Sequence, residues 1–384
     1  MDIISEIKEE TAIAQSSKRP IRVAITHGDA NGVGYELIFK TFAESDLFEL
    51  CVPIVYGSAK IATYHRKAIN SETNFRVIER AEDAEAGQLN LVNCFDQEIL
   101  ISLGRPSTEA GNAAFVALEA AVEDLKVGKV DVLLTAPINK ATIQSSEFNF
   151  QGHTEYLQSK LGGESLMVLT NEIMRVALVT THLPIKDVAA AITPERVEAK
   201  IRQLYHVLRH DYLISAPRVA VFGLNPHNGD AGAIGCEDDD VIVPVIKKLQ
   251  EEGLPVFGPY SADGFFGAGH FSKFDGILAM YHDQGLAPFK ALSMEDGVNY
   301  TAGLQYVRTS PDHGVAYDIA GKGIASESSF RQALYAAIDI YRNREIDSAA
   351  HQNPLPKLYQ DRREDDRRNF VTRNDKRVGN DEQN

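Results

Sequence analysis

The stretch GILAMYHDQG, residues 276–285, places a histidine and an aspartate directly after a mostly apolar run. The run Gly276–Tyr281 has the composition and length of a buried strand in a parallel sheet. His282 and Asp283 follow it without a spacer. In open α/β sheets, ligands bind beyond the carboxyl ends of the strands. The stretch therefore predicts a fold class, α/β, and the edge of the sheet where a site should lie.

The same pattern occurs twice more. RVALVTTHLP (175–184) places His182 just after an apolar run, and RVAVFGLNPHNGD (218–230) places His227 four residues after another. Three neutral imidazoles at one sheet edge could hold a divalent metal and leave positions open for water or substrate. A single histidine after a strand is more often a hydrogen-bonding residue, and some of the eleven histidines would follow strands by chance. The shared apolar lead-in favours the metal hypothesis.

The rest of the chain alternates apolar, β-branched runs with stretches that are apolar at helical spacing, such as 112–128 and 194–212. This alternation predicts helices on both faces of a mostly parallel sheet. We expect two α/β lobes, one formed by residues 20–140 with 285–350 and the other by 141–284, followed by a charged, solvated tail at 360–384. The runs that predict strands lie at 21–26, 52–57, 89–94, 130–136, 166–170, 175–181, 218–223 and 275–281.

Composition limits the functions that the chain can have. The 384 residues carry a formal net charge of −15, which disfavours binding to nucleic acid or to an anionic membrane. No apolar run approaches the roughly 18 residues of a membrane span, and the first twenty residues lack a signal core, so we expect a cytoplasmic protein. Cys51, Cys94 and Cys236 are too few and too far apart for a disulfide framework or a zinc motif.

Two aspartates and a helix start are further candidates. Asp283 and Asp263 could orient a ligand histidine, bind the metal or contact the substrate, and capping of a loop is an equal alternative for both. In QGHTEYL, His153 and Thr154 follow a glycine and precede a helical pattern. They could form an anion site with the helix amides, although Thr154 could equally be the helix N-cap.

Three polar residues downstream suit a small phosphorylated acid. Lys290, Asn299 and Arg308 lie in APFKAL, GVNYT and YVRTSPDHG. Lone cations in loops are usually solvated, but these lie in apolar or glycine-rich surroundings, where a solvated charge is less expected. A lysine and an arginine can bind the phosphate and the carboxylate of such a substrate.

The glycine-rich loop THGDANGVGYE (26–36) does not follow the GxGxxG pattern, and neither does GKGIAS (321–326). The dinucleotide fingerprint of the Rossmann fold is therefore absent.

Taken together, the motifs resemble one known family. GHTEY, TTHLP, GLNPHNGD, YHDQGLAPFK, GVN and RTSPDHGVAYDIAGKG are similar, in order, to the 4-hydroxythreonine-4-phosphate dehydrogenases of pyridoxal phosphate biosynthesis. The resemblance runs from about residue 21 to about residue 341. HGVAYDIAGKGIA also resembles the cofactor-side loop of isopropylmalate dehydrogenases. The implied fold is a two-lobed α/β/α architecture of the isocitrate and isopropylmalate dehydrogenase type.

The resemblance implies a site built from both chains of a homodimer. It implies oxidation of 4-phosphooxy-L-threonine by NAD or NADP, followed by decarboxylation to 3-amino-2-oxopropyl phosphate. The metal, zinc, cobalt or magnesium, would be shared between the chains. Lys290, Asp283 and Asp263 are candidates to move protons. The implied site residues are His182, His227 and His282 for the metal; His153, Thr154, Lys290, Asn299 and Arg308 for the substrate; and His313, Gly314, Asp318 and Lys322 for the cofactor.

The chain departs from the family in the first loop, where Asn31 and Tyr35 replace a small residue and a proline. Other functions stay open. A related dehydrogenase of threonate or erythronate 4-phosphate would use the same metal and cations. A three-histidine metal hydrolase is less compatible with HGVAYDIAGKGIA, and a non-catalytic sensor is less compatible with the intact set of histidines, lysine and arginine.

Overall fold

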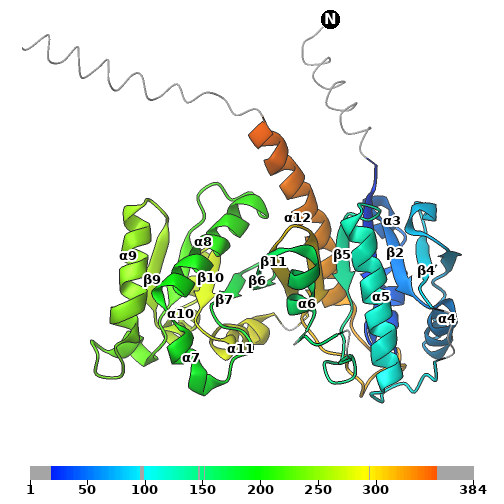
Figure 1. The fold of residues 1–384 in the computed structure, drawn as a ribbon, viewed down its shortest axis with the longest axis horizontal. Helices are drawn as coiled ribbons and strands as arrows, with labels where there is room; N and C mark the ends of the chain where they lie inside the picture. The colour runs from blue at the N-terminus through cyan, green and yellow to red at the C-terminus, as the bar shows by residue number, and fades with distance from the viewer. Residues whose placement is uncertain (1–18, 96–98, 146–147, 151, 294, 353–384) are drawn as a thin grey trace, which may run out of the picture. The chain divides into compact units, whose positions relative to one another are not determined.

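A computed structural model describes residues 19–95, 99–145, 148–150, 152–293 and 295–352. Within these residues the strands form one twelve-stranded sheet with helices on both sides (Figure 1). This confirms the α/β fold class. In the order in which they lie in the sheet, the strands are β3 (Phe75–Ile78), β4 (Leu89–Asn93), β2 (Cys51–Gly57), β1 (Ile21–Thr26), β5 (Val132–Thr135), β12 (Val307–Pro311), β11 (Val298–Leu304), β6 (Gly163–Thr170), β7 (Arg175–Leu178), β10 (Gly276–Ala279), β8 (Val219–Phe222) and β9 (Val256–Tyr260).

Two parallel groups of strands meet at an antiparallel centre. Strands β1 to β5 and β12 form one group whose members pair in parallel, and β7, β8, β9 and β10 form the other. Strand β11 pairs antiparallel with β12 and β6, and β6 pairs antiparallel with β7. All eight predicted strands are present, and β3, β9, β11 and β12 are additional.

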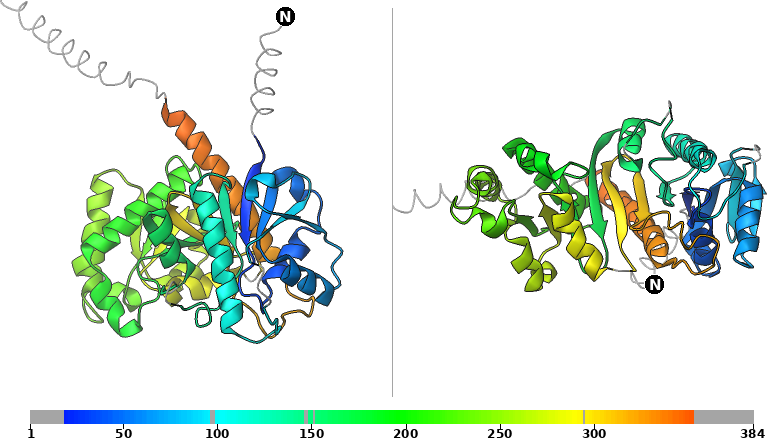
Figure 2. Two further views of the ribbon diagram at one scale, coloured as in Figure 1. Left: turned by 45° about the vertical axis from the view of Figure 1, so that its right-hand side comes forward. Right: turned by 90° about the horizontal axis from the view of Figure 1, so that it is seen from below.

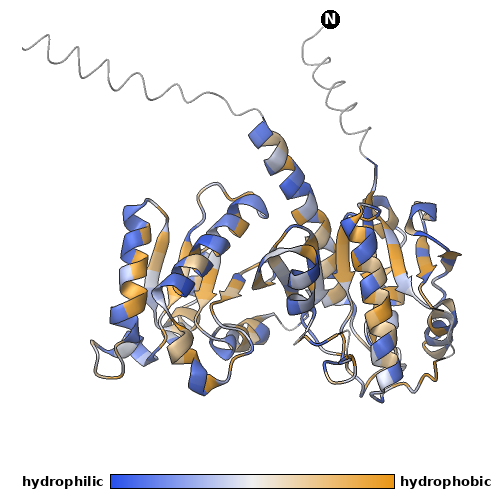
Figure 3. Cartoon of the chain, in the orientation of Figure 1, coloured by the Kyte–Doolittle hydropathy of each residue, from blue (hydrophilic) through white to orange (hydrophobic). Residues whose placement is uncertain are grey.

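The strands alternate their side chains between two layers of helices. Val23 and Ile25 of β1 face a core with α2 and α12, whereas Ala24 between them packs in a separate core with α5. On β10, Leu278 joins the core under α8 and α9, and Ile277 joins a third core with α10 and α11. Figure 3 shows apolar strands beside helices that carry both apolar and polar surfaces. This period of two residues places helices on both faces of the sheet.

Two of the long helices begin at a side-chain N-cap. Ser107 Oγ accepts a hydrogen bond from Ala110 N–H at the start of α5, and Thr193 Oγ1 accepts from Arg196 N–H at the start of α8. The helices are α2 (Gly34–Thr41), α3 (Leu47–Leu50), α4 (Ala59–Ala68), α5 (Thr108–Lys126), α6 (His153–Leu161), α7 (Ile185–Ala191), α8 (Pro194–His210), α9 (Val243–Glu251), α10 (Ala262–Gly267), α11 (His282–Leu292) and α12 (Ser328–Gln352). In the described residues, none of these helices has the length and apolarity to cross a membrane.

The two-lobe division stays a prediction. Contacts between Cα atoms group residues 1–343 into one compact unit and place residues 344–384 in a second. The two parallel groups of strands are compatible with two lobes inside the first unit. The predicted boundary between residues 284 and 285 falls inside helix α11, which packs against β7 and β10 (Figure 2). The predicted charged tail, 360–384, lies outside the described residues.

Candidate active site

Arg308 is a buried cation on the inner strand β12. Only 2% of its surface is exposed, and its guanidinium donates hydrogen bonds to the hydroxyls of Thr135 (2.6 and 3.1 Å) and Thr301 (2.9 Å). Burial lowers the pKa of Arg308 to about 9, and the charge of nearby Glu155 raises it in part. The guanidinium is therefore still charged at neutral pH, and it donates these hydrogen bonds to neutral hydroxyls. This leaves a positive charge that an anion can balance.

His153 and Thr154 open helix α6 beside this cation. The N-cap position is Gly152, which provides no side-chain cap, so Thr154 is not the N-cap. His153 Nε2 is buried without a hydrogen-bond partner in the described structure. Burial, followed by the charges of Arg308 and Lys140, holds the pKa of His153 well below its usual range, so the ring is neutral.

These groups line one cavity of about 230 Å³. Four of the five predicted substrate contacts lie on its wall: His153, Thr154, Asn299 and Arg308. Asn299 Oδ1 is also buried without a partner in the described residues. The cavity thus offers a guanidinium, an imidazole, a hydroxyl and an amide to a small ligand, and its size suits a small phosphorylated acid better than a large one.

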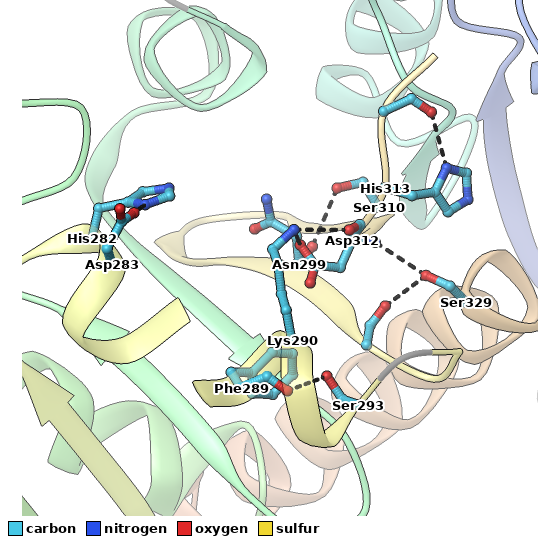
Figure 4. Close-up of polar contacts among 12 residues, drawn as sticks. His282, Asp283, Phe289, Lys290, Ser293, Asn299, Ser310, Asp312, His313 and Ser329 are labelled. Carbon is cyan, nitrogen blue, oxygen red and sulfur yellow. Dashed lines mark hydrogen bonds and ion pairs between the residues drawn. The ribbon is translucent and has the colours of Figure 1, made fainter. Parts of the chain in front are cut away.

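Lys290, the fifth predicted substrate contact, does not line this cavity. Its ammonium lies 2.9 Å from Asp312 Oδ1 and donates a hydrogen bond to the Asp312 carbonyl oxygen at 3.1 Å. Burial raises the pKa of Asp312, and the contact with Lys290 opposes that shift. Figure 4 shows the lysine side chain pointing from α11 toward Asn299 and Asp312.

Two of the three predicted metal ligands lie near each other. The ring centroids of His182 and His282 are 5.8 Å apart. His282 Nδ1 and Asp283 Oδ1 are joined by a 2.7 Å hydrogen bond, which leaves Nε2 of His282 available. Asp283 therefore contacts His282 and does not cap α11, and its role in orienting a metal ligand stays a prediction.

His182 is bordered by two further charges. Its Nδ1 lies 3.9 Å from Glu155 Oε1, and its Nε2 lies 3.5 Å from the ammonium of Lys140. Hydrogen bonding to His182 is the main cause that lowers the pKa of Glu155. An ammonium at Nε2 indicates that this nitrogen presents its lone pair, which is also what a metal ion requires.

His227 lies in a short helical turn, Pro226–Gly229, with a left-handed backbone (φ 53°). His227 is exposed. The pKa of nearby Asp263 is lowered, mainly by the hydrogen bond from Ser261 (2.6 Å) and to a lesser degree by His227. In the described part of this single chain, no three His, Cys, Asp or Glu side chains gather in a geometry that could hold a metal. The three-histidine site stays a prediction.

The predicted cofactor residues divide into two groups. His313 and Gly314 line the cavity next to Arg308, and His313 Nδ1 is hydrogen bonded to the Gly314 carbonyl oxygen at 3.0 Å. Burial lowers the pKa of His313, so its ring is neutral. Asp318 and Lys322 are exposed and do not line the cavity.

Several residues of the site were missed from the sequence. Lys140 and Glu155 line the cavity, and Lys140 lies in TAPINK, directly after strand β5. That position at the carboxyl end of a strand was a usable signal. Asp29 was also missed: it accepts hydrogen bonds from the hydroxyls of Tyr317 (2.8 Å) and Thr142 (3.3 Å), which ties the first loop to the segment after Gly314.

The chain is similar over most of its length to known proteins. The family model "Pyridoxal phosphate biosynthetic protein PdxA" matches residues 49–337. A 4-hydroxythreonine-4-phosphate dehydrogenase of Bacteroides thetaiotaomicron is 56% identical over 347 residues, covering 90% of this chain and 95% of that protein. A putative D-threonate 4-phosphate dehydrogenase of Oceanobacillus iheyensis is 40% identical over 329 residues, covering 84% and 98%. The crystal structure of a 4-hydroxythreonine-4-phosphate dehydrogenase from Klebsiella pneumoniae superposes with a TM-score of 0.74 at 32% identity, covering 85% and 99%.

Proposed function

Because the chain belongs to the PdxA family of pyridoxal phosphate biosynthetic proteins, we propose that it oxidises 4-phosphooxy-L-threonine with NAD or NADP. The relatives are dehydrogenases, so the chain is an oxidoreductase. The oxidised substrate is a β-keto acid, which loses carbon dioxide to give 3-amino-2-oxopropyl phosphate. This reaction belongs to the biosynthesis of pyridoxal 5′-phosphate.

The observation that carries the proposal is the charge of the cavity. Buried Arg308 has hydroxyl partners and faces a space also lined by neutral His153 and by Asn299, whose amide oxygen is unpaired in the described structure. In our proposal these groups bind the anionic ends of the substrate, and Lys290 contributes from beside Asn299 when its pair with Asp312 rearranges.

Glu155 supports an amino acid as the substrate. It lines the cavity, and its Oε2 is buried without a hydrogen-bond partner among the described residues. Its pKa is lowered, so the oxygen carries negative charge. A carboxylate in this position favours an ammonium group, which 4-phosphooxy-L-threonine has and threonate 4-phosphate lacks. Oxidation of threonate 4-phosphate is the second candidate, because a relative with 40% identity carries that name.

A divalent cation fits the residues at one end of the cavity. His182 and His282 would hold it with His227, and we propose that a second copy of the chain completes the site in a homodimer. The two nearer rings are 5.8 Å apart, and Asp283 and Glu155 lie beside their Nδ1 atoms. When bound, zinc, cobalt or magnesium would supply Lewis acidity that lowers the pKa of the substrate alcohol.

The nicotinamide cofactor would accept the hydride. His313 and Gly314 would contact it from the cavity wall, with Asp318 and Lys322 further along the same segment. Lys290, Asp283 and Asp263 remain the candidates to move the alcohol proton. Lys290 forms an ion pair with Asp312. Asp283 is hydrogen bonded to His282, and Asp263 is hydrogen bonded to Ser261.

Thermal unfolding with separate ligands tests the proposal. NAD or NADP at a hundred times its dissociation constant should stabilise the protein by about 2.7 kcal/mol. That corresponds to a rise in the unfolding temperature of several degrees. A metal hydrolase should show no shift with either dinucleotide. Absence of any shift with NAD and NADP, with and without a divalent metal, would contradict the proposed dehydrogenase.

A further inference from the structure

The strand ends that carry the three histidines are linked by a chain of hydrogen bonds. Strand β10 lies between β7 and β8. On the β7 side, the main-chain ladder continues beyond both strands: Val179 N–H donates to the Ala279 carbonyl at 2.9 Å, and Thr180 N–H donates to the Met280 carbonyl at 3.1 Å. The Thr180 hydroxyl adds a 2.8 Å bond to the same carbonyl. The segments that lead to His182 and His282 are thereby held together.

On the β8 side, a side chain replaces the ladder. The parallel register between β10 and β8 ends at the pair Leu278 and Val221. Beyond that pair, Gln284 connects the segments that follow β10 and β8. Its Oε1 accepts from Met280 N–H at 2.7 Å, and its Nε2 donates to the Gly223 carbonyl at 2.6 Å. Gln284 lies in the first turn of α11, two residues after His282. One amide side chain thus sets the spacing at the point where the strands diverge.

The loop that Gln284 contacts is held firmly from its first residue. Gly223 N–H donates to the Tyr260 carbonyl at 2.9 Å. The buried carboxylate of Asp238 accepts from Leu224 N–H at 2.7 Å and from Asn225 N–H at 3.0 Å. A Cβ atom on Gly223 would lie 2.5 Å or less from side-chain atoms of Asn228 and Asp238, so this approach requires glycine. Gln284 thus contacts the first residue of an anchored loop that carries His227 four residues later.

We propose that Gln284 is a positioning residue for the metal site, which sets the separation between the His227 loop and His282. This inference rests on the proposed function, because it concerns the predicted metal ligands. The role requires an amide: one end must accept from Met280 N–H and the other must donate to the Gly223 carbonyl. Glutamate would place an oxygen against that carbonyl, and methionine would leave both groups without a partner.

The test is cobalt(II) binding to the metal-free, full-length protein, measured by calorimetry and by visible absorption. We expect Gln284→Met and Gln284→Glu to weaken cobalt binding on the order of ten- to a hundredfold, the effect seen when residues that orient metal ligands are replaced. Gln250→Met is the matched control, because Gln250 Nε2 also donates to a main-chain carbonyl, that of Val256, at 2.7 Å. This control should bind cobalt within about twofold of the unchanged protein. Unfolding of each metal-free variant, followed by circular dichroism, selects a temperature at which all are folded.

His227→Ala separates the two levels of the argument. If it abolishes tight cobalt binding and both folded Gln284 variants bind like Gln250→Met, the positioning role of Gln284 is wrong and the metal site stands. If His227→Ala binds cobalt as tightly as the unchanged protein, the metal assignment itself fails. If Gln284→Met does not fold, the Gln284→Glu result decides, since this variant keeps the size of the side chain and its bond to Met280 N–H.

Discussion

At the scale of single residues, Arg308 has a role that its contacts explain. Its guanidinium is 2% exposed and donates to Thr135 and Thr301, both of which are neutral. A buried charge lowers stability unless negative charge lies near it. Glu155 supplies part of that negative charge, and in the proposed function an anionic group of the substrate supplies the rest.

Replacing Arg308 by lysine tests this role. Arg308→Lys keeps a positive charge but loses the planar set of donors, so we expect substrate binding to weaken by about 1.5–3 kcal/mol, roughly ten- to more than a hundredfold in KM. Steady-state kinetics measure the change. Arg202→Lys is the control, because Arg202 pairs with Glu198 and Glu252 on the surface. An Arg308→Lys enzyme with unchanged KM would show that no substrate anion binds there.

The sequence identified seven of the sixteen residues that line the cavity, but not their arrangement. The motif resemblance selected His153, Thr154, Asn299 and Arg308, which the fold brings to one cavity. Glu155 adjoins Thr154, yet nothing in the order of residues shows that it would lie 3.9 Å from His182. That distance depends on how α6 packs beside the end of β7, which is a property of tertiary structure.

At the scale of elements, the first loop shows why its unusual residues are present. The buried side chain of Asn31 accepts from Ser102 N–H at 2.8 Å and donates to the Arg105 carbonyl at 2.9 Å and to Ser107 Oγ at 3.3 Å. Tyr35 is stacked on His27, and its hydroxyl accepts from Ser58 N–H at 3.1 Å. Both substitutions in this loop thus bind neighbouring segments of the fold.

Removal of the Asn31 side chain should destabilise the protein. Asn31→Ala removes the buried amide that pairs with the partly buried Ser102 N–H and with the Arg105 carbonyl, and we expect a loss of roughly 1–3 kcal/mol in the free energy of unfolding. Urea denaturation followed by circular dichroism gives this value. Asn74→Ala serves as the control, since Asn74 is exposed and accepts a bond from Arg66 on the surface. Equal stability of the two variants would contradict a stabilising role for the hydrogen bonds of Asn31.

The elements that the sequence missed share a physical reason. Strands β11 and β12 carry polar residues that line the cavity: Asn299 lies on β11 and Arg308 on β12. Gly303 and Pro311 further weaken the strand pattern in these segments. Strand β3 has only one buried position, so its sequence lacks a continuous apolar run. Functional and edge strands carry the weakest signal of their own secondary structure.

At the scale of the whole molecule, buried histidines should make the fold sensitive to acid. Burial lowers the pKa of His27 to about 3 and that of His65 to about 4, whereas both would titrate near 6.5 in the unfolded chain. Between about pH 6 and pH 4 the unfolded state binds more protons than the folded state, so stability falls as the pH falls.

The size of this effect can be measured. The two protons that His27 and His65 bind only in the unfolded state contribute roughly 2.7 kcal/mol per pH unit to the slope in that window. Free energies of unfolding in urea at several pH values determine the slope. His65→Gln should reduce it by roughly 1.4 kcal/mol per pH unit, and an unchanged slope in that variant would exclude His65 as a source of acid sensitivity.

The central claim, oxidation of a phosphorylated amino acid by a nicotinamide cofactor, is tested most directly by absorbance at 340 nm. The purified protein would be mixed with NAD or NADP, a divalent metal and 4-phosphooxy-L-threonine, with threonate and erythronate 4-phosphates in parallel. We predict cofactor reduction with the amino acid that stops when the metal is chelated. Reduction with the hydroxy acids alone would contradict the substrate assignment, and no reduction with any of the three would contradict the proposed activity.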